Sequence, residues 1–281
     1  MDMHLDIRPS PIAGQWYPGE AHRLGDSVDR YLEAAGQPTI EGEIIAIMVP
    51  HAGHMYSGPV AGYAFAALHG LVPELVAVVS PMHYPYFQAL LTSAHTHYAT
   101  PLGNIRIDQA AVKTLDEHLQ KGLGYGLAHI KNDPEHSLEI ELPFLQRSLK
   151  GSFKLLPVMV REQSSQVARH LGTALAKTLA GRPVLLVAST DLSHFKDQET
   201  TNILDAEVLR CVEAFDPEGV IQAEEEGKGF ACGRGALAAV MWAAKELGAN
   251  HIQVLRHATS GDVTGDFDRV VGYGAAVITR K

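Results

Sequence analysis

The sequence predicts an α/β protein in which helices cover both faces of a mostly parallel, mixed sheet. Short apolar, β-branched runs alternate with segments of helical period along the whole chain, which is the pattern of βαβ units. The 281 residues are 46% hydrophobic, enough for one large core, and no change in composition marks a linker. We therefore expect a single domain over residues 1–281 with three layers, α/β/α.

The expected strands are short runs rich in Val, Ile and Leu. They cover residues 44–49, 75–80, 89–93, 154–160, 183–189, 251–258 and 270–278. Helical patterns between them predict helices near residues 58–69, 108–120, 138–149, 164–180, 201–215 and 234–247. Glycines and an Asn-Asp-Pro sequence favour a loop over 121–136. The Gly-rich residues 260–266 match neither a P-loop nor a dinucleotide-binding motif, so a turn is expected there.

Composition excludes several classes of function. The net charge is −9 with acidic and basic residues interspersed, so no basic stripe is present for a nucleic acid. The N-terminal sequence lacks the pattern of a signal peptide, and no stretch reaches the roughly 18 to 20 apolar residues that span a bilayer. We expect a cytoplasmic protein that does not bind membranes. Two cysteines, Cys211 and Cys232, do not form a disulfide framework and fit a reducing compartment.

Three histidines follow buried strands closely. His51, His83 and His194 each lie within five residues of the carboxyl end of an expected strand. In open α/β sheets, ligands bind at that edge because its loops converge. His51 and His83 are the best metal ligands, since neutral imidazole binds Fe, Zn and Cu and nearby prolines stiffen both turns. His54 can supplement the site or line its wall.

Cys232 directly precedes the helix expected at 234–247. The positive end of a helix lowers the pKa of a thiol and favours the thiolate, the form that binds metals or attacks electrophiles. The alternative is a small buried residue in a tight turn. Cys211 lies within an amphipathic helical pattern and is expected in the core.

His136 and Asp191 are further candidates near this edge. His136 precedes a helix start on a loop, and together with His194 it can supply proton transfers. Asp191 can orient a ligating or basic histidine, or it can be an ordinary turn residue. A Ser-His-Asp hydrolase is a weak alternative: Asp191, Ser193 and His194 supply the residue types, but adjacent residues rarely aim at one another, and no G-x-S-x-G motif occurs.

With these residues identified, the chain resembles the Memo family, called AmmeMemoRadiSam system protein B in prokaryotes. The matching stretches are RPSPIAGQWYPG (8–19), VPHAGHMYSGPVAGYAF (49–65), SPMHY (80–84), EHSLEIELPFL (135–145), ASTDLSHF (188–195), ACGRGAL (231–237) and HATSGDVTGDFDRVVGYGA (257–275). They span almost the whole length in one order. The family is similar in fold to the LigB-like class III extradiol dioxygenases, α/β enzymes that use non-haem Fe(II) to open catechol rings.

The resemblance implies that His51, His83 and Cys232 are metal ligands, with His136, Asp191 and His194 lining the same pocket. In the extradiol enzymes the third ligand is a glutamate, whereas here a cysteine occupies that place. A softer ligand shifts both metal preference and redox potential, which argues against ring cleavage. His54 is a second departure, because many relatives carry an aromatic residue there.

Three functions remain open at this point. The first is a dioxygenase-like oxidoreductase with Fe(II), or copper, and open positions for O₂ and substrate, in which His136, Asp191, His194 and Cys232 take part in catalysis. The second is a signalling module that binds a peptide or small ligand without turnover. The third is a zinc-dependent hydrolase. The resemblance also implies a functional partnership with AMMECR-type and radical-SAM proteins.

Overall fold

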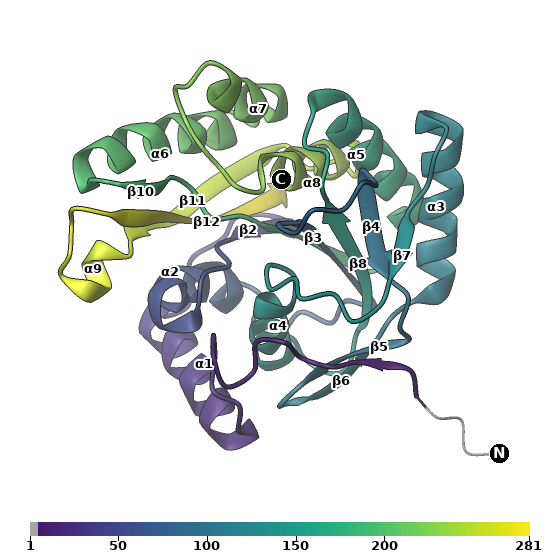
Figure 1. Ribbon diagram of the computed structural model, residues 1–281, viewed down its shortest axis with the longest axis horizontal. Coiled ribbons are helices and arrows are strands. Elements are labelled where there is room, and N and C mark those ends of the chain that lie inside the picture. Colours follow the sequence, from purple (N-terminus) through teal and green to yellow (C-terminus); the bar gives the residue numbers. More distant parts are fainter. Residues whose placement is uncertain (1–4) are drawn as a thin grey trace.

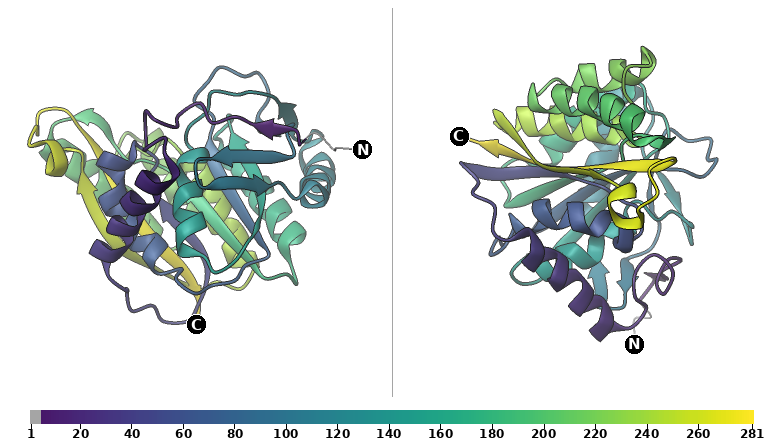
Figure 2. Two further views of the ribbon diagram at one scale, coloured as in Figure 1. Left: turned by 90° about the horizontal axis from the view of Figure 1, so that it is seen from below. Right: turned by 90° about the vertical axis from the view of Figure 1, so that its left-hand side faces the viewer.

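The computed structural model describes residues 5–281, and in it helices cover both faces of a central sheet (Figure 1). On one face lie α5 (Ser165–Leu179), α6 (Gln198–Glu213), α7 (Pro217–Glu225) and α8 (Arg234–Glu246), with α3 (Gln109–Leu123) packed beside α5. On the other face lie α1 (Ala21–Ala35), α2 (His54–Ala66) and α4 (Leu142–Ser148). The edge-on view in Figure 2 shows these layers. The expected three-layer α/β/α fold is confirmed.

Within residues 5–281 the central sheet has nine strands in the order β10-β12-β2-β9-β3-β8-β4-β7, and β11 also pairs with β12. The strands are β2 (Glu43–Val49), β3 (Leu75–Pro81), β4 (Leu90–Ser93), β7 (Ala128–Ile130), β8 (Lys154–Val160), β9 (Val184–Ser189), β10 (His194–Lys196), β11 (His251–Thr259) and β12 (Val270–Arg280). The four central strands, β2-β9-β3-β8, are parallel, and antiparallel pairs flank them. All seven strands expected from the sequence form.

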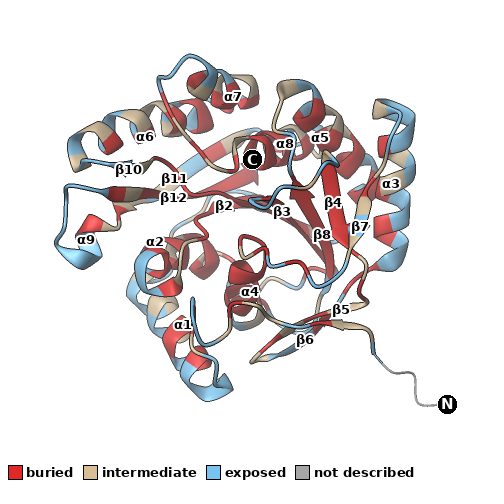
Figure 3. Ribbon diagram, in the orientation of Figure 1, coloured by how far each residue is buried: buried red, intermediate tan, exposed pale blue. Residues whose placement is uncertain are grey.

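The parallel centre is buried on both faces, as Figure 3 shows. Every residue of β3 is buried, and β8 is buried beyond its first residue. Strands covered on both faces consist of continuous apolar runs rather than alternating ones, which is why these segments were recognisable in the sequence. No helix in the described part of the chain combines the length and apolar character needed to cross a bilayer.

Several elements differ from the sequence expectation. A separate sheet of β1 (Ile7–Arg8), β5 (His97–Thr100) and β6 (Gly103–Arg106) was not predicted, because strands of two to four residues carry too little periodicity. The expected loop at 121–136 contains the end of α3 and the short strand β7. Helices α1 and α7 were missed, and the 260–266 connection contains α9 (Gly261–Thr264).

The strand order creates the site. β2, β9 and β3 are adjacent and parallel, so their carboxyl ends, at Val49, Ser189 and Pro81, lie at one edge. The loops after them carry His51, Asp191 and His83. α2 begins at His54 and not near residue 58, so His54 belongs to a helix rather than to a loop.

Helices α1 and α2 pack closely, and this contact yields a stability prediction. A Cβ at Gly62 would lie 2.6 Å from the backbone oxygen of Tyr31. Alanine favours a helix interior by about 1 kcal/mol over glycine, but overpacking against backbone costs roughly 1 to 3 kcal/mol. We expect Gly62→Ala to lower the free energy of unfolding by about 2 kcal/mol in urea titrations.

The matched control is Gly25→Ala in α1, where the nearest atom to a new Cβ is Leu102 Cδ2 at 3.9 Å. This variant should raise the free energy of unfolding by about 0.5 to 1 kcal/mol, since only the helix preference changes. Equal effects of the two substitutions would show that the α1–α2 contact is not tight.

Candidate metal centre

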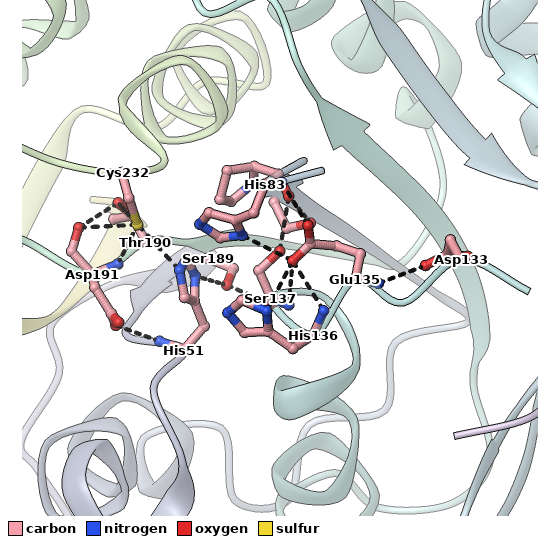
Figure 4. Close-up of polar contacts among 12 residues, drawn as sticks. His51, His83, Asp133, Glu135, His136, Ser137, Ser189, Thr190, Asp191 and Cys232 are labelled. Atoms are coloured by element: carbon pink, nitrogen blue, oxygen red, sulfur yellow. Dashed lines mark hydrogen bonds and ion pairs between the residues drawn. The ribbon is translucent and has the colours of Figure 1, made fainter. Parts of the chain in front are cut away.

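Three imidazoles meet at the sheet edge. His51, His83 and His136 each offer a ring nitrogen, and these atoms lie within 4.8 Å of one another (Figure 4). The His51 ring stands edge-on to the His83 ring with 5.3 Å between centroids, and His136 stacks on His83 at 4.8 Å. Two residues predicted as metal ligands thus lie beside one predicted to transfer protons.

His51 is held by a hydrogen-bonded serine. Its Nδ1 lies 2.8 Å from Ser189 Oγ, which is also 2.7 Å from the Ser137 carbonyl and 2.8 Å from Glu141 Oε1. Burial raises the pKa of Glu141 well above its usual range. The hydroxyl proton of Ser189 is directed at the Ser137 carbonyl and Glu141, so its oxygen accepts the His51 Nδ1–H. Nε2 of His51 is left with its lone pair for a metal.

Glu135 orients the His83 ring as Ser189 orients the His51 ring, but it does so through an ionised carboxylate. Its oxygens accept the His83 backbone N–H (2.6 Å) and Nδ1–H (2.9 Å), and the backbone N–H groups of His136 (2.9 Å) and Ser137 (3.0 Å). Burial alone would raise the pKa of Glu135, but the hydrogen bond and charge of His83, with smaller contributions from His136 and Ser137, lower it to about 2. His136 Nδ1 lies 3.3 Å from the same carboxylate. The Nε2 atom of His83 therefore remains free.

Two of the three imidazoles have lowered pKa values. Burial, reinforced by the charges of neighbouring histidines, lowers the pKa of His51 well below its usual value. Burial also lowers the pKa of His136 to about 4. Neutral imidazole is the form that binds metals, so these rings need no deprotonation. The His83 side chain is 31% exposed, which leaves one side of the group open to solvent.

Cys232 lies next to His51. Its Sγ is 3.1 Å from His51 Nε2 and 3.3 Å from the backbone nitrogen of Asp191, which donates to it. Burial, and then the charge of Asp191, raises the pKa of the Cys232 thiol well above its usual value. The expectation that the start of α8 would lower this pKa is therefore wrong, because desolvation outweighs the helix end. A cation at the sulfur would favour the thiolate.

Asp191 acts on the main chain of His51 rather than on its ring. Its Oδ1 accepts the backbone N–H groups of His51 (2.7 Å) and Ala52 (3.3 Å). Burial raises the pKa of Asp191 to about 7, despite these hydrogen bonds. The residue thus fixes the loop that presents His51 and titrates near neutral pH.

His194 and His54 occupy different places from the three grouped histidines. His194 packs against Phe195 and Phe230, burial lowers its pKa, and its Nε2 has no hydrogen-bond partner within residues 5–281. His54 is buried in α2, where its Nε2 donates to the Ile140 carbonyl at 2.9 Å. His54 therefore supports the structure behind the centre and is not part of the ligand group.

A cavity of about 490 Å³ adjoins the group. Its lining includes Trp16, Ala52, Tyr56, Phe195 and Tyr273. The Trp16 ring lies 4.1 Å from the His136 ring, and Ala52 follows His51 directly, so the cavity and the imidazoles share a wall. A small aromatic-lined cavity of this size is typical of small-molecule sites.

The donor set fits a divalent transition metal. Such ions bind imidazole nitrogen at about 2.0 to 2.1 Å and thiolate sulfur at about 2.3 Å. The free ring nitrogens already lie within 4.8 Å of one another, and the sulfur is adjacent to one of them. Cys232 lies outside the group of three imidazoles, so a shared ion would require its side chain to move. Whether Cys232 or His136 is the third ligand stays a prediction.

Fold and donor group define a class: three-layer α/β proteins with a histidine-rich candidate metal site. The chain belongs to the Memo family, whose model, described as Memo-like protein, matches residues 8–277. The resemblance seen in the sequence is confirmed.

Relatives in archaea and bacteria match over nearly their full length. A MEMO1 family protein of Nitrosopumilus maritimus is 34% identical, covering 96% of this chain and 98% of its own. Another from Methanosarcina mazei is 34% identical, covering 98% and 100%, and one from Thermotoga maritima is 32% identical, covering 96% and 99%. The solved structure of uncharacterized protein JW3007 from Escherichia coli K12 matches with a TM-score of 0.53 and 14% identity, over 84% of this chain and all of that one. That likeness shows the shared fold alone.

Glu135 and Ser189 are the supporting residues that sequence reasoning missed. Glu135 directly precedes His136, and Ser189 ends the strand before Asp191. A carboxylate beside a candidate ligand was the available signal, because ligating imidazoles usually donate their second N–H to such a group.

His54 yields a prediction on acid stability. Burial lowers its pKa to about 4, from 6.5 in an unfolded chain. Below about pH 6.5 His54 therefore binds a proton in the unfolded chain but not in the folded protein. The free energy of unfolding falls as the pH falls toward 4. His54→Gln keeps a donor for the Ile140 carbonyl without titrating. Between about pH 7 and pH 5, the wild type should lose about 2 kcal/mol more unfolding free energy than His54→Gln. Parallel curves of stability against pH would contradict the assignment.

Proposed function

We propose that this protein is a metal-dependent redox protein of the dioxygenase-like kind, which binds one Fe(II) or copper ion through His51 Nε2, His83 Nε2 and the Cys232 sulfur. The observation that carries the proposal is the orientation of the two imidazoles: Ser189 and Glu135 hold their Nδ1 atoms, so both Nε2 atoms keep a lone pair, and that of His51 faces the Cys232 sulfur. When bound, such an ion would supply electrons to O₂ or a substrate.

The remaining residues bind and move protons. The neutral rings of His136 and His194 accept protons, and the carboxyl of Asp191 exchanges one near neutral pH. The cavity next to Trp16 accommodates a small molecule or one side chain of a peptide. Its aromatic rings offer apolar contact surface for such a group.

A zinc-dependent hydrolase is the second candidate, and the three-imidazole group favours it. His51, His83 and His136 form a neutral ligand set of the kind that leaves a fourth position for water on zinc. The two proposals differ in the third ligand. A thiolate at Cys232 suits Cu(I), iron or zinc, whereas three imidazoles match the His₃ ligand set of catalytic zinc sites.

Metal analysis of protein purified without oxygen tests both proposals. Under the redox proposal, close to one Fe or Cu per chain is expected, and the Fe(II) form gives a nitrosyl EPR signal with nitric oxide. Cys232→Ser should weaken Fe(II) binding by more than the roughly 10- to 100-fold that loss of a supporting residue costs, while His136→Gln stays within that range.

The matched control is Cys211→Ser, at a buried thiol that belongs to the core. It should bind metal like the wild type. Bound zinc together with unchanged affinity in Cys232→Ser would replace the redox proposal by the hydrolase. Absence of any bound metal would contradict both the redox proposal and the hydrolase proposal.

A further inference from the structure

Arg8 is a buried arginine that reaches the loop carrying Glu135. It lies in β1, is 1% exposed, and its guanidinium enters the segment 133–139. Nε and Nη2 donate to the two carboxylate oxygens of Asp133 at 2.9 and 2.8 Å, and Nη1 donates to the carboxylate of Glu139. Nη2 also donates to the backbone carbonyl of Glu135 at 2.7 Å. One side chain thus contacts three acidic residues of the same loop.

Charge and shape both require an arginine here. Asp133, Glu135 and Glu139 are all buried, and a buried carboxylate without a partner is costly. Arg8 provides the positive charge, and its Cζ lies 4.7 Å above the Tyr98 ring. The planar fork of guanidinium donors serves two carboxylates and a carbonyl at once, which a lysine ammonium cannot do with the same geometry.

Glu135 is held from both ends. Arg8 binds its carbonyl, while its carboxylate accepts N–H groups from His83, His136 and Ser137. Movement of the Glu135 backbone would move its carboxylate away from His83 Nδ1. His51 depends on this loop less directly, because Ser189 holds its ring and Ser189 in turn donates to the Ser137 carbonyl.

We propose that Arg8 is a positioning residue of the metal centre: by fixing the 133–139 loop it places Glu135 so that His83 presents Nε2 to the ion and His136 stays beside it. This role rests on the proposed metal site but makes its own local prediction. Loss of the arginine geometry should loosen His83 and His136 more than His51, whose ring is connected to this loop through Ser189.

The test is ¹⁵N NMR of the histidine rings in protein without added metal, comparing wild type with Arg8→Lys. Lysine keeps the positive charge but lacks the planar set of N–H donors of the guanidinium group. In the wild type, His51 and His83 should show protonated Nδ1 and unprotonated Nε2. In Arg8→Lys, the His83 Nδ1–H signal should be lost to exchange while the His51 signal persists, and Co²⁺ should bind about 10- to 100-fold more weakly.

Arg182→Lys is the matched control. Arg182 also donates to a buried aspartate, Asp108, at 3.1 Å, but it precedes β9 at the strand end opposite the centre. It should leave the ring signals and Co²⁺ affinity unchanged even if it lowers the melting temperature by as much as Arg8→Lys does. If Arg8→Lys does not fold, Asp133→Asn removes one charged partner of Arg8 and should shift the His83 signal in the same direction.

The outcomes separate the two proposals. A wild-type His83 signal and wild-type Co²⁺ affinity in Arg8→Lys would overturn the positioning role, and so would equal loss of the His51 and His83 signals, which indicates general loosening. Failure of the wild type to bind Co²⁺ would count against the metal site, while the ring signals would still decide the role of Arg8.

Discussion

The centre depends on keeping the ionised carboxylate of Glu135 buried. Removing a carboxylate from water costs several kcal/mol unless hydrogen bonds replace its hydration. Here four N–H groups replace it, two from His83 and one each from His136 and Ser137. These same bonds orient the residues that donate them. The charge is therefore stabilised by the residues that it positions, and Arg8 fixes the loop beneath it.

Three buried carboxyl groups near this edge have different protonation states, and the number of their donors explains why. Glu135 accepts four N–H groups, and its pKa falls to about 2. Asp191 accepts two backbone N–H groups, and burial still raises its pKa to about 7. Glu141 has only the Ser189 hydroxyl, and its pKa is raised well above the usual range. One small volume thus contains a fixed negative charge, a group that exchanges protons near neutral pH and a carboxyl whose pKa is raised further by burial.

The sequence predicted what depends on long-range periodicity and missed what depends on local contacts. Continuous apolar runs identified the buried strands, and the rule that ligands bind at strand carboxyl ends placed His51 and His83 together. The short strands β5 and β6 carry no comparable signal. The roles of Glu135 and Ser189 depend on which imidazole nitrogen each one meets, and that is set by loop geometry. The pKa of Cys232 was mispredicted because its helix position was visible in the sequence, whereas its burial beside Asp191 was not.

The imidazole nitrogens and the Cys232 sulfur differ in how much free energy metal binding costs them, and this difference bears on which ion the centre selects. Burial lowers the pKa of His51 and His136, and the rings of His51 and His83 are already oriented, so binding a metal to these imidazoles costs little. The Cys232 thiol must first lose a proton, and each unit by which its pKa exceeds the ambient pH costs about 1.4 kcal/mol. Only an ion with strong affinity for sulfur offsets the free energy of deprotonation, since soft ligands favour soft ions. A buried thiol that must first be deprotonated, beside imidazoles that are already oriented, disfavours ions that bind sulfur weakly. This supports the proposed Cu(I) or iron over hard cations such as Mg²⁺.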